Sequence, residues 1–505
     1  MYSLGLKQFL NLTREGNLIP VYKEINADLD TPVSLFLKLK KSNFAFLLES
    51  VEGQEKVARY SFLGTNPSFV FKSKGRDIEI ISLTGKRKYF VTDTTPLDEI
   101  KKIMSAFRPV KVRDLPRFYG GLVGYMSYDM VRFFEDIPDK NPDDLNVPDS
   151  VFMLTDNILI FDHIKHTVKI VVNLMLGDRK FSRQEKAKAY LNAIKKIDAI
   201  EKELLRNLPY KQMNPGNSPQ RIKLEANFTK SQFQRNVMKA KEYIKKGDII
   251  QVVPSQRFKI NIKRRPLEIY RNLRTLNPSP YMFFLHLKDI FLIGSSPEML
   301  VRCENGVIQT RPIAGTRRRG ENEEEDARLA EELINDKKER AEHIMLVDLG
   351  RNDLGRVSRP GTVTVSEFMS IEKYSHVMHL VSEVRGELDC NKDIYDVLRS
   401  VFPAGTVSGS PKIRAMEIID ELENVKRGPY AGCVGYFSFS QNMDACITIR
   451  TIVVKGKYAY VQSGAGIVAD SIPEKEYQES VNKAKALLEA ITGGCRVVMS
   501  KNPFR

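Results

Sequence analysis

The chain has 505 residues, enough for two or three ordinary domains or one large composite. Its net charge is +16, but the basic residues are scattered, without a zinc-ligand spacing, a basic tail or an RNA-binding aromatic motif, which argues against a nucleic-acid partner. The five cysteines are widely spaced, which argues against disulfides and structural zinc. The N-terminus is unlike a signal peptide, and no apolar run is long enough to cross a membrane. These features favour the cytoplasm.

Short apolar runs bounded by turn residues predict a strand-rich N-terminal subdomain over residues 1–207. Residues 44–48 predict a buried strand, and residues 151–161 and 167–174 predict a hairpin. Apolar residues at helical spacing, with lysines between them, predict a long amphipathic helix over 182–205.

A change of composition at residues 208–225 predicts a linker, because this segment contains three prolines among polar residues. A second unit, residues 226–505, is expected to follow. It opens with a predicted helix over 229–246, and residues 248–258 predict a strand. Gln251 is polar within that apolar strand, so it either faces a ligand or satisfies a buried partner.

Three further segments carry candidate functional groups. Residues 324–350 predict one long helix in which Glu342 lies beside an apolar stripe, where a lone carboxylate is normally solvated or paired. Residues 402–412 form a loop of small residues that opens a helix, and Thr406 belongs either to a carboxylate site or to an ordinary helix cap. Two histidines within 374–380 lack further ligands nearby in the sequence, which favours a core role over a metal pair.

The stretch from residue 446 to 483 predicts two strands followed by a helix. The first strand, 447–454, carries Arg450, and the second ends in Gly464-Ala465-Gly466, where small residues let a ligand approach the backbone. One face of the helix carries Glu476, Glu479 and Lys483. A guanidinium, bare backbone and a row of carboxylates could hold a small acidic molecule and a hard cation; a plain hairpin with a solvated helix fits equally well.

These pieces form an ordered set of motifs: G-S-S-P-E (294–298), R-P-I-A-G-T (311–316), E-R-A-E-H-I-M-L-V-D-L-G-R-N-D (339–353), Y-S-H-V-M-H-L-V-S (374–382), F-P-A-G-T-V-S-G-S-P-K (402–412), I-R-T (449–451) and S-G-A-G-I-V-A-D-S (463–471). The set resembles the chorismate-utilising enzymes, and most closely the large subunits of anthranilate synthase, component I. The resemblance covers essentially the whole chain. It implies an α/β (α+β) fold of two subdomains, with two facing, mostly antiparallel sheets and helices outside.

The resemblance implies a Mg²⁺-dependent conversion of chorismate and ammonia to anthranilate and pyruvate, the first step of tryptophan biosynthesis. Ammonia would add at ring carbon 2 as the 4-hydroxyl leaves, and loss of pyruvate would then make the ring aromatic. Glu298 matches the acid that protonates the departing hydroxyl, and His379 matches the histidine that assists pyruvate elimination. Glu342 and Glu479 match the magnesium carboxylates, with Glu476 as a weaker candidate.

The resemblance also assigns the two carboxylates of chorismate to two groups of residues. The enolpyruvyl carboxylate would be held by Tyr430, Arg450, Gly464, Ala465 and Gly466. The side of the ring carboxylate would be formed by Gly315, Thr316 and the catalytic Thr406.

Two positions distinguish the chain from other members of the family. Gln251 stands where members that add water carry a lysine base, and Ala314 stands where enzymes that make aminodeoxychorismate typically carry a lysine nucleophile. Both differences favour anthranilate over the alternative, an aminodeoxychorismate synthase component I. A non-catalytic basic binding protein is the alternative from another class, and it would bind polyanions in a strongly salt-dependent way.

Control and ammonia supply are implied by two further features. The segments at 47–50 and 277–282 resemble the pair that binds tryptophan as a feedback inhibitor, which assigns Ser50, Pro280, Tyr281 and Met282 to an effector site. No cysteine nucleophile lies in a G-x-C-x-G setting, so a separate glutamine amidotransferase subunit, component II, is expected to supply ammonia.

Overall fold

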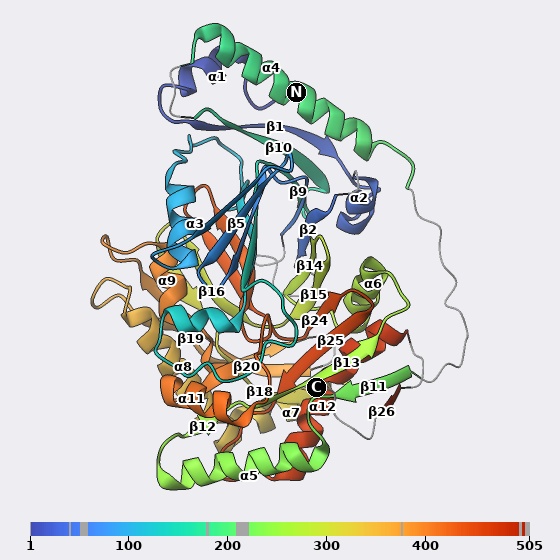
Figure 1. The fold of residues 1–505 in the computed structure, drawn as a ribbon, viewed down its shortest axis with the longest axis vertical. Coiled ribbons are helices and arrows are strands. Elements are labelled where there is room, and N and C mark those ends of the chain that lie inside the picture. Colours follow the sequence, from blue (N-terminus) through green and yellow to red (C-terminus); the bar gives the residue numbers. More distant parts are fainter. Residues whose placement is uncertain are drawn as a thin grey trace.

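Two large β-sheets face each other through the length of the chain, with helices around them (Figure 1). The computed structural model describes residues 2–39, 42–50, 59–177, 181–208, 222–374 and 377–493, together with the backbone of 497–499. Helices α1 and α4 lie over one end of the molecule, and α5, α11 and α12 lie at the other. The predicted fold class is confirmed.

The first sheet joins strands from both halves of the chain, and each described neighbouring pair is antiparallel except the last. In spatial order its strands are β1 (Leu18–Asn26), β10 (Thr167–Met175), β9 (Asn157–Asp162), β3 (Tyr60–Thr65), β2 (Phe44–Glu49), β14 (Tyr281–Leu287), β15 (Ile290–Ser296), β24 (Thr451–Lys455), β25 (Tyr458–Gly464), β13 (Ser255–Asn261), β11 (Ile222–Ala226) and β26 (Val497–Met499).

The second sheet is also antiparallel and also joins both halves. Its strands, in spatial order, are β18 (Ile313–Arg318), β20 (Val377–Glu387), β17 (Val307–Thr310), β16 (Met299–Glu304), β23 (Met443–Ile447), β22 (Cys433–Ser438), β7 (Gly121–Met126), β8 (Ser150–Thr155), β4 (Phe69–Lys74), β5 (Asp77–Ser82) and β6 (Arg87–Val91), and β19 (Thr364–Lys373) pairs with β20. A separate short pair is formed by β12 (Gln251–Val252) and β21 (Gly409–Ser410).

The helices connect these strands and cover their outer faces. They are α1 (Leu6–Leu12), α2 (Pro32–Lys38), α3 (Pro96–Ser105), the 3₁₀ helix η1 (Tyr128–Phe133), α4 (Arg183–Leu204), α5 (Lys230–Lys246), α6 (Pro266–Leu276), α7 (Glu323–Asn335), α8 (Lys337–Gly355), α9 (Ile394–Val401), α10 (Gly405–Ser408), α11 (Lys412–Leu422) and α12 (Pro473–Thr492). Local signals set their ends: the Ser182 side chain caps α4, and the left-handed Gly247 ends α5. The predicted helices at 182–205 and 229–246 are confirmed.

The core has two layers because side chains alternate along each strand. On β2, Phe46 points into the cluster between the two sheets, whereas its neighbour Leu47 points into the cluster under the helices. Phe62 and Leu63 on β3 divide in the same way. Strands that are buried on both faces have continuous apolar sequences, so they can be predicted from the amino-acid sequence.

Two segments that were predicted as single strands are wrong in one respect. Each contains two strands, and the two strands belong to different sheets. Residues 151–161 form β8 in the second sheet and β9 in the first, and residues 447–454 are divided at 448–450 between β23 and β24. The first crossing falls at Thr155-Asp156-Asn157 and the second at Thr448-Ile449-Arg450, so each is marked in the sequence only by a short interruption between two apolar runs. The predicted hairpin of 151–161 with 167–174 is therefore β9 with β10 alone.

Two other predicted elements are interrupted. The helix expected over 324–350 is α7 and α8, separated at Asp336, whose side chain accepts hydrogen bonds from the first turn of α8. The strand expected over 248–258 is divided into β12 and β13. The proposed boundary between the halves lies in the linker 208–225, of which 209–221 are outside the described residues, and β11 begins at Ile222.

Packing between neighbouring strands predicts the effect of one substitution. A Cβ at Gly64 would lie 2.3 Å from the buried Phe46 ring, whereas a Cβ at Gly177 would meet nothing within 4 Å. Gly64→Ala should therefore lower the free energy of unfolding by about 1–3 kcal/mol through overpacking, and Gly177→Ala should leave it nearly unchanged. Urea denaturation of both variants measures this, and equal midpoints would contradict the packing described.

Candidate active site

Glu298 and Arg450 both lie where the chain passes from one large sheet to the other. Glu298 is between β15 and β16, and Arg450 is between β23 and β24. The two connections are bonded to each other: Ile447 N donates to the Glu298 carbonyl, and Ser295 N donates to the Arg450 carbonyl, both at 3.1 Å. Ser296 Oγ adds a bond of 2.7 Å to the Ile447 carbonyl. Two charged residues are thereby fixed on adjacent backbone segments.

The Glu298 side chain is buried and lines a cleft of about 420 Å³. Burial raises the pKa of Glu298 to about 8, because desolvation outweighs the opposite effects of the Thr406 hydroxyl and the Lys483 ammonium. The carboxyl is therefore mostly protonated at pH 7. A neutral carboxylic acid in a cleft can donate a proton to a leaving group.

Thr406 lines the same cleft from α10. Its Oγ1 is buried near the Glu298 carboxyl, but it makes no hydrogen bond of normal geometry with the residues that the structure describes. A buried hydroxyl without a partner costs free energy, so a ligand or a water that bonds to it is favoured there. The cleft thus contains an acid and an unsatisfied hydroxyl side by side.

A bulge in β18 holds Gly315 and Thr316 next to His379 on β20. Gly315 has φ +65°, and a Cβ there would lie 2.9 Å from Leu333 Cδ1, so the position requires glycine. The Gly315 carbonyl lies 2.8 Å from His379 Nδ1, and Thr316 Oγ1 lies 3.2 Å from the same nitrogen. The bulge therefore fixes the orientation of the imidazole.

The contact with Gly315 also fixes the protonation of His379. A carbonyl can only accept, so Nδ1 carries the proton and Nε2 presents a lone pair. Burial lowers the pKa of His379, and the Arg450 charge lowers it further, against the opposite effect of the Gly315 bond. His379 is therefore neutral at pH 7 and can accept a proton at Nε2.

Two cations, Arg450 and Lys483, lie beside the backbone at the end of β25. Arg450 Nη1 donates to the Lys483 carbonyl at 2.9 Å, and Lys483 Nζ donates to the Gly464 carbonyl at 3.2 Å. Arg450 has φ +50°, a costly conformation for a residue with a Cβ that is found mainly where the surrounding structure imposes it. Burial lowers the pKa of Arg450, as expected for a desolvated guanidinium that would gain from an anionic partner.

The backbone next to these cations leaves no room for side chains. A Cβ at Gly464 would lie 3.1 Å from the Tyr430 hydroxyl, and a Cβ at Gly466 would lie 2.7 Å from Gln251 Nε2. Ala465 between them is buried. Burial raises the pKa of Tyr430 to about 12, so its hydroxyl stays protonated and can donate. Two cations, a phenol and bare backbone suit a carboxylate.

Glu342 on α8 and Glu479 on α12 bring carboxylates to the same region. Gln251 Nε2 donates to Glu342 Oε1 at 3.1 Å, and Lys483 Nζ lies 2.7 Å from Glu479 Oε1. Burial raises the pKa of Glu342, and the negative charge of Glu479 adds to the rise. The pKa of Glu476 is raised by burial and by Glu479 as well. These carboxylates destabilise one another, and a bound cation would relieve the repulsion.

The donor set fits magnesium better than a transition metal. Over the described residues, no group of three or more His, Cys, Asp or Glu side chains could hold a metal ion. Magnesium needs fewer protein ligands, since it takes one or two carboxylates and completes its shell with waters and ligand oxygens. Glu342 and Glu479 satisfy that requirement.

Lys483 is the site residue that the sequence analysis did not assign. Its ammonium contacts both Glu479 and the Gly464 carbonyl, and its charge acts on Glu298. The available signal was its position one turn after Glu479 on the same helical face. Gln251, left open between two roles, has a hydrogen-bond partner in the half-buried Glu342 and lies beside the backbone of Gly466.

The four predicted effector residues line one cavity of about 520 Å³, which shares no lining residue with the Glu298 cleft. They are Ser50, Pro280, Tyr281 and Met282. Ser50 Oγ is buried and has no hydrogen-bond partner among the described residues. The opposite wall is charged: Tyr281 Oη donates to Asp444 Oδ1 at 3.0 Å, and Asp444 pairs with Arg302 at 2.8 Å. A small zwitterion has suitable partners here.

Comparison with known proteins shows the family of the chain. The family model of chorismate binding enzymes matches residues 43–489. The chain belongs to this family. It is 52% identical over 491 residues to anthranilate synthase component 1 of Aquifex aeolicus, covering 97% of this chain and 98% of the relative, and 50% identical over 495 residues to that of Acetivibrio thermocellus, covering 97% and 99%. These identities place this chorismate binding enzyme among the anthranilate synthase component 1 proteins.

The solved structures agree. The crystal structure of anthranilate synthase component I from Streptococcus pneumoniae TIGR4 superposes with a TM-score of 0.76 at 37% identity, covering 92% of this chain and 98% of that one. The resemblance stated from the motifs is confirmed at the level of the family and of component I. Separately, in the described part of this chorismate binding enzyme no helix is long and apolar enough to cross a membrane.

The raised pKa of Glu298 predicts how stability depends on pH. The ordinary value is 4.5 and the folded value about 8, so folding favours the protonated form, and stability falls as pH rises from about 4.5 to 8. Glu298→Gln removes this titration. Relative to the unsubstituted enzyme, the variant should gain up to roughly 5 kcal/mol between pH 5 and pH 9. Urea denaturation of both proteins across this range measures it; a difference that stays constant with pH would contradict the assignment.

Proposed function

We propose that the chain is the chorismate-converting subunit of an anthranilate synthase, which makes anthranilate and pyruvate from chorismate and ammonia with Mg²⁺. The observation that carries the proposal is the placement of the neutral acid Glu298 near the cation Lys483, which with Arg450 borders bare backbone. A dicarboxylate needs cations, and a departing hydroxyl needs an acid. Family membership supports chorismate as the substrate.

The first step is an addition with loss of water. The ammonia lone pair forms a bond to ring carbon 2, the double bonds shift, and the bond from carbon 4 to its oxygen breaks. Hydroxide is a poor leaving group, so the Glu298 carboxyl donates its proton and water departs. Burial keeps that proton in place near neutral pH, which is the protonation state the step requires.

The second step is an elimination. The ring loses a proton from carbon 2, the bond from carbon 3 to the enolpyruvyl oxygen breaks, and the side chain takes up a proton at its methylene to leave as pyruvate. His379 is neutral, with Nδ1–H held by Gly315, so Nε2 is the group that we assign to assist this proton transfer. Aromaticity of the product drives the step.

The substrate carboxylates are proposed to lie on two sides. Arg450, Lys483 and the Tyr430 hydroxyl would bind the enolpyruvyl carboxylate against Gly464, Ala465 and Gly466. Thr406, Gly315 and Thr316 would lie beside the ring carboxylate. Glu342 and Glu479 would hold Mg²⁺, which would neutralise a substrate carboxylate when bound.

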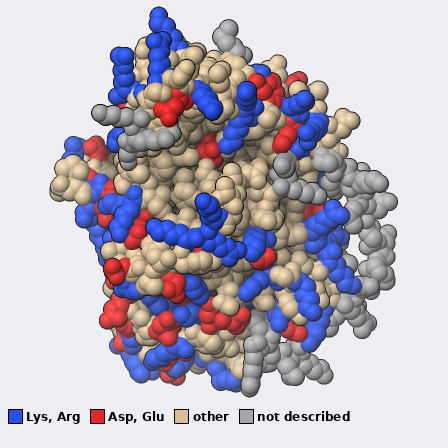
Figure 2. Space-filling view, turned by 45° about the horizontal axis from the view of Figure 1, so that its top comes forward, with Lys and Arg blue, Asp and Glu red and all other residues tan. Residues whose placement is uncertain are grey.

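Two residues favour ammonia and anthranilate over related outcomes. The Gln251 amide donates to Glu342 and has no basic lone pair with which to activate water. Ala314 lies on β18 next to Leu380 and has no nucleophilic atom. Aminodeoxychorismate synthesis remains the second candidate. On the face shown in Figure 2, acidic side chains are interspersed with the basic ones, which disfavours a polyanion-binding protein.

A partner and an inhibitor belong to the same proposal. The designation component 1 of the relatives implies a further component, which we take to be a glutamine amidotransferase that supplies ammonia, with both in the cytoplasm. The cavity containing Ser50, Pro280, Tyr281 and Met282 is proposed to bind tryptophan, because an unsatisfied hydroxyl and charged groups line a mainly apolar space.

The direct test is to incubate the purified protein with chorismate, Mg²⁺ and ammonium salts and to identify the product by fluorescence and mass spectrometry. Glu479→Gln should reduce kcat/KM by at least about 10²-fold, and added Mg²⁺ should restore little of it. Glu474→Gln, on the exposed first turn of the same helix, is the matched control and should keep normal activity. Normal rates in Glu479→Gln would refute the metal assignment, and a product other than anthranilate would refute the proposed reaction.

Tryptophan binding has its own test. Ser50→Ala removes the buried hydroxyl from the cavity, so it should raise the inhibitory concentration of tryptophan about tenfold or more while leaving uninhibited activity intact. Ser61→Ala is the control, since Ser61 is buried on β3 and does not line the cavity. The measurement is the tryptophan inhibition curve of each variant. Unchanged inhibition in Ser50→Ala would contradict the assignment of this cavity as the effector site.

A further inference from the structure

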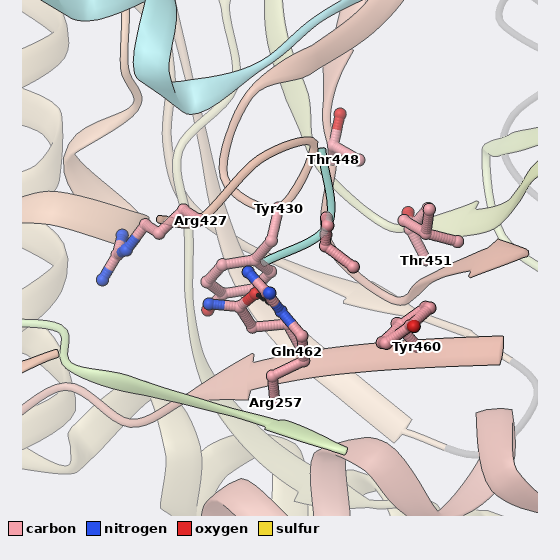
Figure 3. Close-up of a pocket in the computed structure, with 9 residues that line it drawn as sticks. Arg257, Arg427, Tyr430, Thr448, Thr451, Tyr460 and Gln462 are labelled. Carbon is pink, nitrogen blue, oxygen red and sulfur yellow. Dashed lines mark hydrogen bonds between the residues drawn. The ribbon is translucent and has the colours of Figure 1, made fainter. Parts of the chain in front are cut away.

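Two fully buried arginines, Arg257 and Arg427, border a cavity of about 280 Å³ that Tyr430 also lines (Figure 3). Their exposed fractions are 1% and 2%. A buried guanidinium is costly unless each charge and donor is compensated. The hydrogen-bond partners of each arginine therefore show which segments its guanidinium holds in place.

Arg427 binds three segments that border the active site. Its Nη1 donates to the Val407 carbonyl at 2.7 Å, and its Nη2 donates to the Val253 carbonyl at 2.6 Å. Val407 follows Thr406 in α10, and Val253 is two residues after Gln251. The guanidinium also lies 5.5 Å from the centre of the Tyr430 ring. Arg427 thus contacts the backbone next to Thr406, the backbone near Gln251 and the ring of Tyr430.

The remaining donors of Arg427 are compensated by Glu423, four residues earlier in the segment that follows α11. Arg427 Nε lies 3.1 Å from both carboxylate oxygens, and Nη2 lies 2.6 Å from Oε1. Glu423 Oε1 also accepts from the backbone N and the hydroxyl of Ser255, at 2.8 and 2.7 Å. Each nitrogen of the guanidinium therefore has an acceptor, which specifies the geometry of the network in a way that an apolar cluster would not.

Arg257 faces the same cavity but holds other parts of the fold. Its Nε donates to Gln462 Oε1 at 2.9 Å, and its two terminal nitrogens bond Asp144 and the Lys426 carbonyl. Lys426 directly precedes Arg427, so Arg257 bonds the backbone of the segment that carries Arg427, but none of its partners belongs to the segments that carry Thr406 or Gln251. The two arginines are therefore alike in burial and charge and differ in whether they bind the walls of the site.

We propose that Arg427 is a positioning residue for the reaction: from behind the site, its guanidinium sets the relative placement of Thr406, Gln251 and Tyr430. Gln251, two residues before Val253, bonds Glu342, so Arg427 is connected to a proposed metal carboxylate through the Val253–Gln251 segment. The guanidinium spreads its donors over three nitrogens, which reach Glu423, Val407 and Val253 in different directions. The donors of a lysine ammonium all lie on one nitrogen, so lysine cannot reproduce this geometry. The inference rests on the proposed function for its kinetic consequences, but the placement itself can be measured without turnover.

The kinetic test compares Arg427→Lys with Arg257→Lys in the ammonia-dependent reaction, assayed well below the melting temperature of both variants. Arg427→Lys should reduce kcat/KM about 10²-fold, with a lower kcat and a raised Mg²⁺ requirement, because misplacement of reacting groups by about 1 Å has a cost of this size. Arg257→Lys should retain kinetic constants close to those of the unsubstituted enzyme. Equal losses in the two variants would overturn the proposal, since both would then reflect general destabilisation.

Hydrogen exchange supplies the readout that does not depend on activity. In Arg427→Lys, amides of residues 250–254 and 404–410 should exchange faster, while those of the distant β1–β10 pair stay protected. In Arg257→Lys the 250–254 and 404–410 amides should be unchanged. If the unsubstituted protein makes no anthranilate but this exchange pattern appears, the proposed function fails and the positioning role stands.

Glu423→Gln tests the same network with a milder change. It keeps the shape and the acceptor oxygen but removes the charge, so it should give an intermediate kinetic loss and increased exchange in the same two segments. If neither Arg427→Lys nor Glu423→Gln can be recovered as a folded protein, the guanidinium serves the whole fold and the proposal is overturned. Normal kinetics and normal exchange in a folded Arg427→Lys would overturn it as well.

Discussion

The structure depends on the crossing of the chain between its two sheets. At the β15–β16 and β23–β24 connections the backbone leaves one ladder before it joins the other, so its polar groups must find partners in the interior. They find them in each other, through the bonds of Ser295, Ser296 and Ile447. This pairing fixes Glu298 and Arg450 within a buried setting, where each is desolvated and therefore sensitive to a ligand.

The electrostatics of the site follow from that burial. Glu298 holds its proton, and Arg450 lacks a carboxylate partner among the hydrogen bonds and ion pairs described, while Lys483 is shared between Glu479 and a backbone carbonyl. Glu342 and Glu479 repel each other across the same region. Buried ionisable groups without a full set of partners are unfavourable. A dianionic ligand together with a divalent cation, as proposed for this site, would supply such partners.

The amino-acid sequence predicts the candidate residues of this site better than their geometry. Glu298 and His379 are assigned through the family resemblance, since the residues alone favour a core role for His379. The crossings are marked only by short interruptions, Thr155-Asp156-Asn157 and Thr448-Ile449-Arg450, which do not show that the chain changes sheets there. The sequence places Lys483 on the face of Glu476 and Glu479 without giving it a role, and it does not mark Arg427. Cations are common in this basic chain, and only long-range contacts separate a structural or site cation from a solvated one.

Selectivity in the proposed reaction depends on what the site lacks as much as on what it contains. Ammonia brings its own lone pair and needs no general base, whereas water must be deprotonated before it attacks. A site that carries Gln251 bound to Glu342 and a protonated Glu298 offers acid assistance to the leaving group but little basic assistance to the nucleophile. Such a site favours the nucleophile that is already neutral and reactive. The Gln251 amide is neutral, so its bond to Glu342 adds no positive charge that would compete with the proposed Mg²⁺.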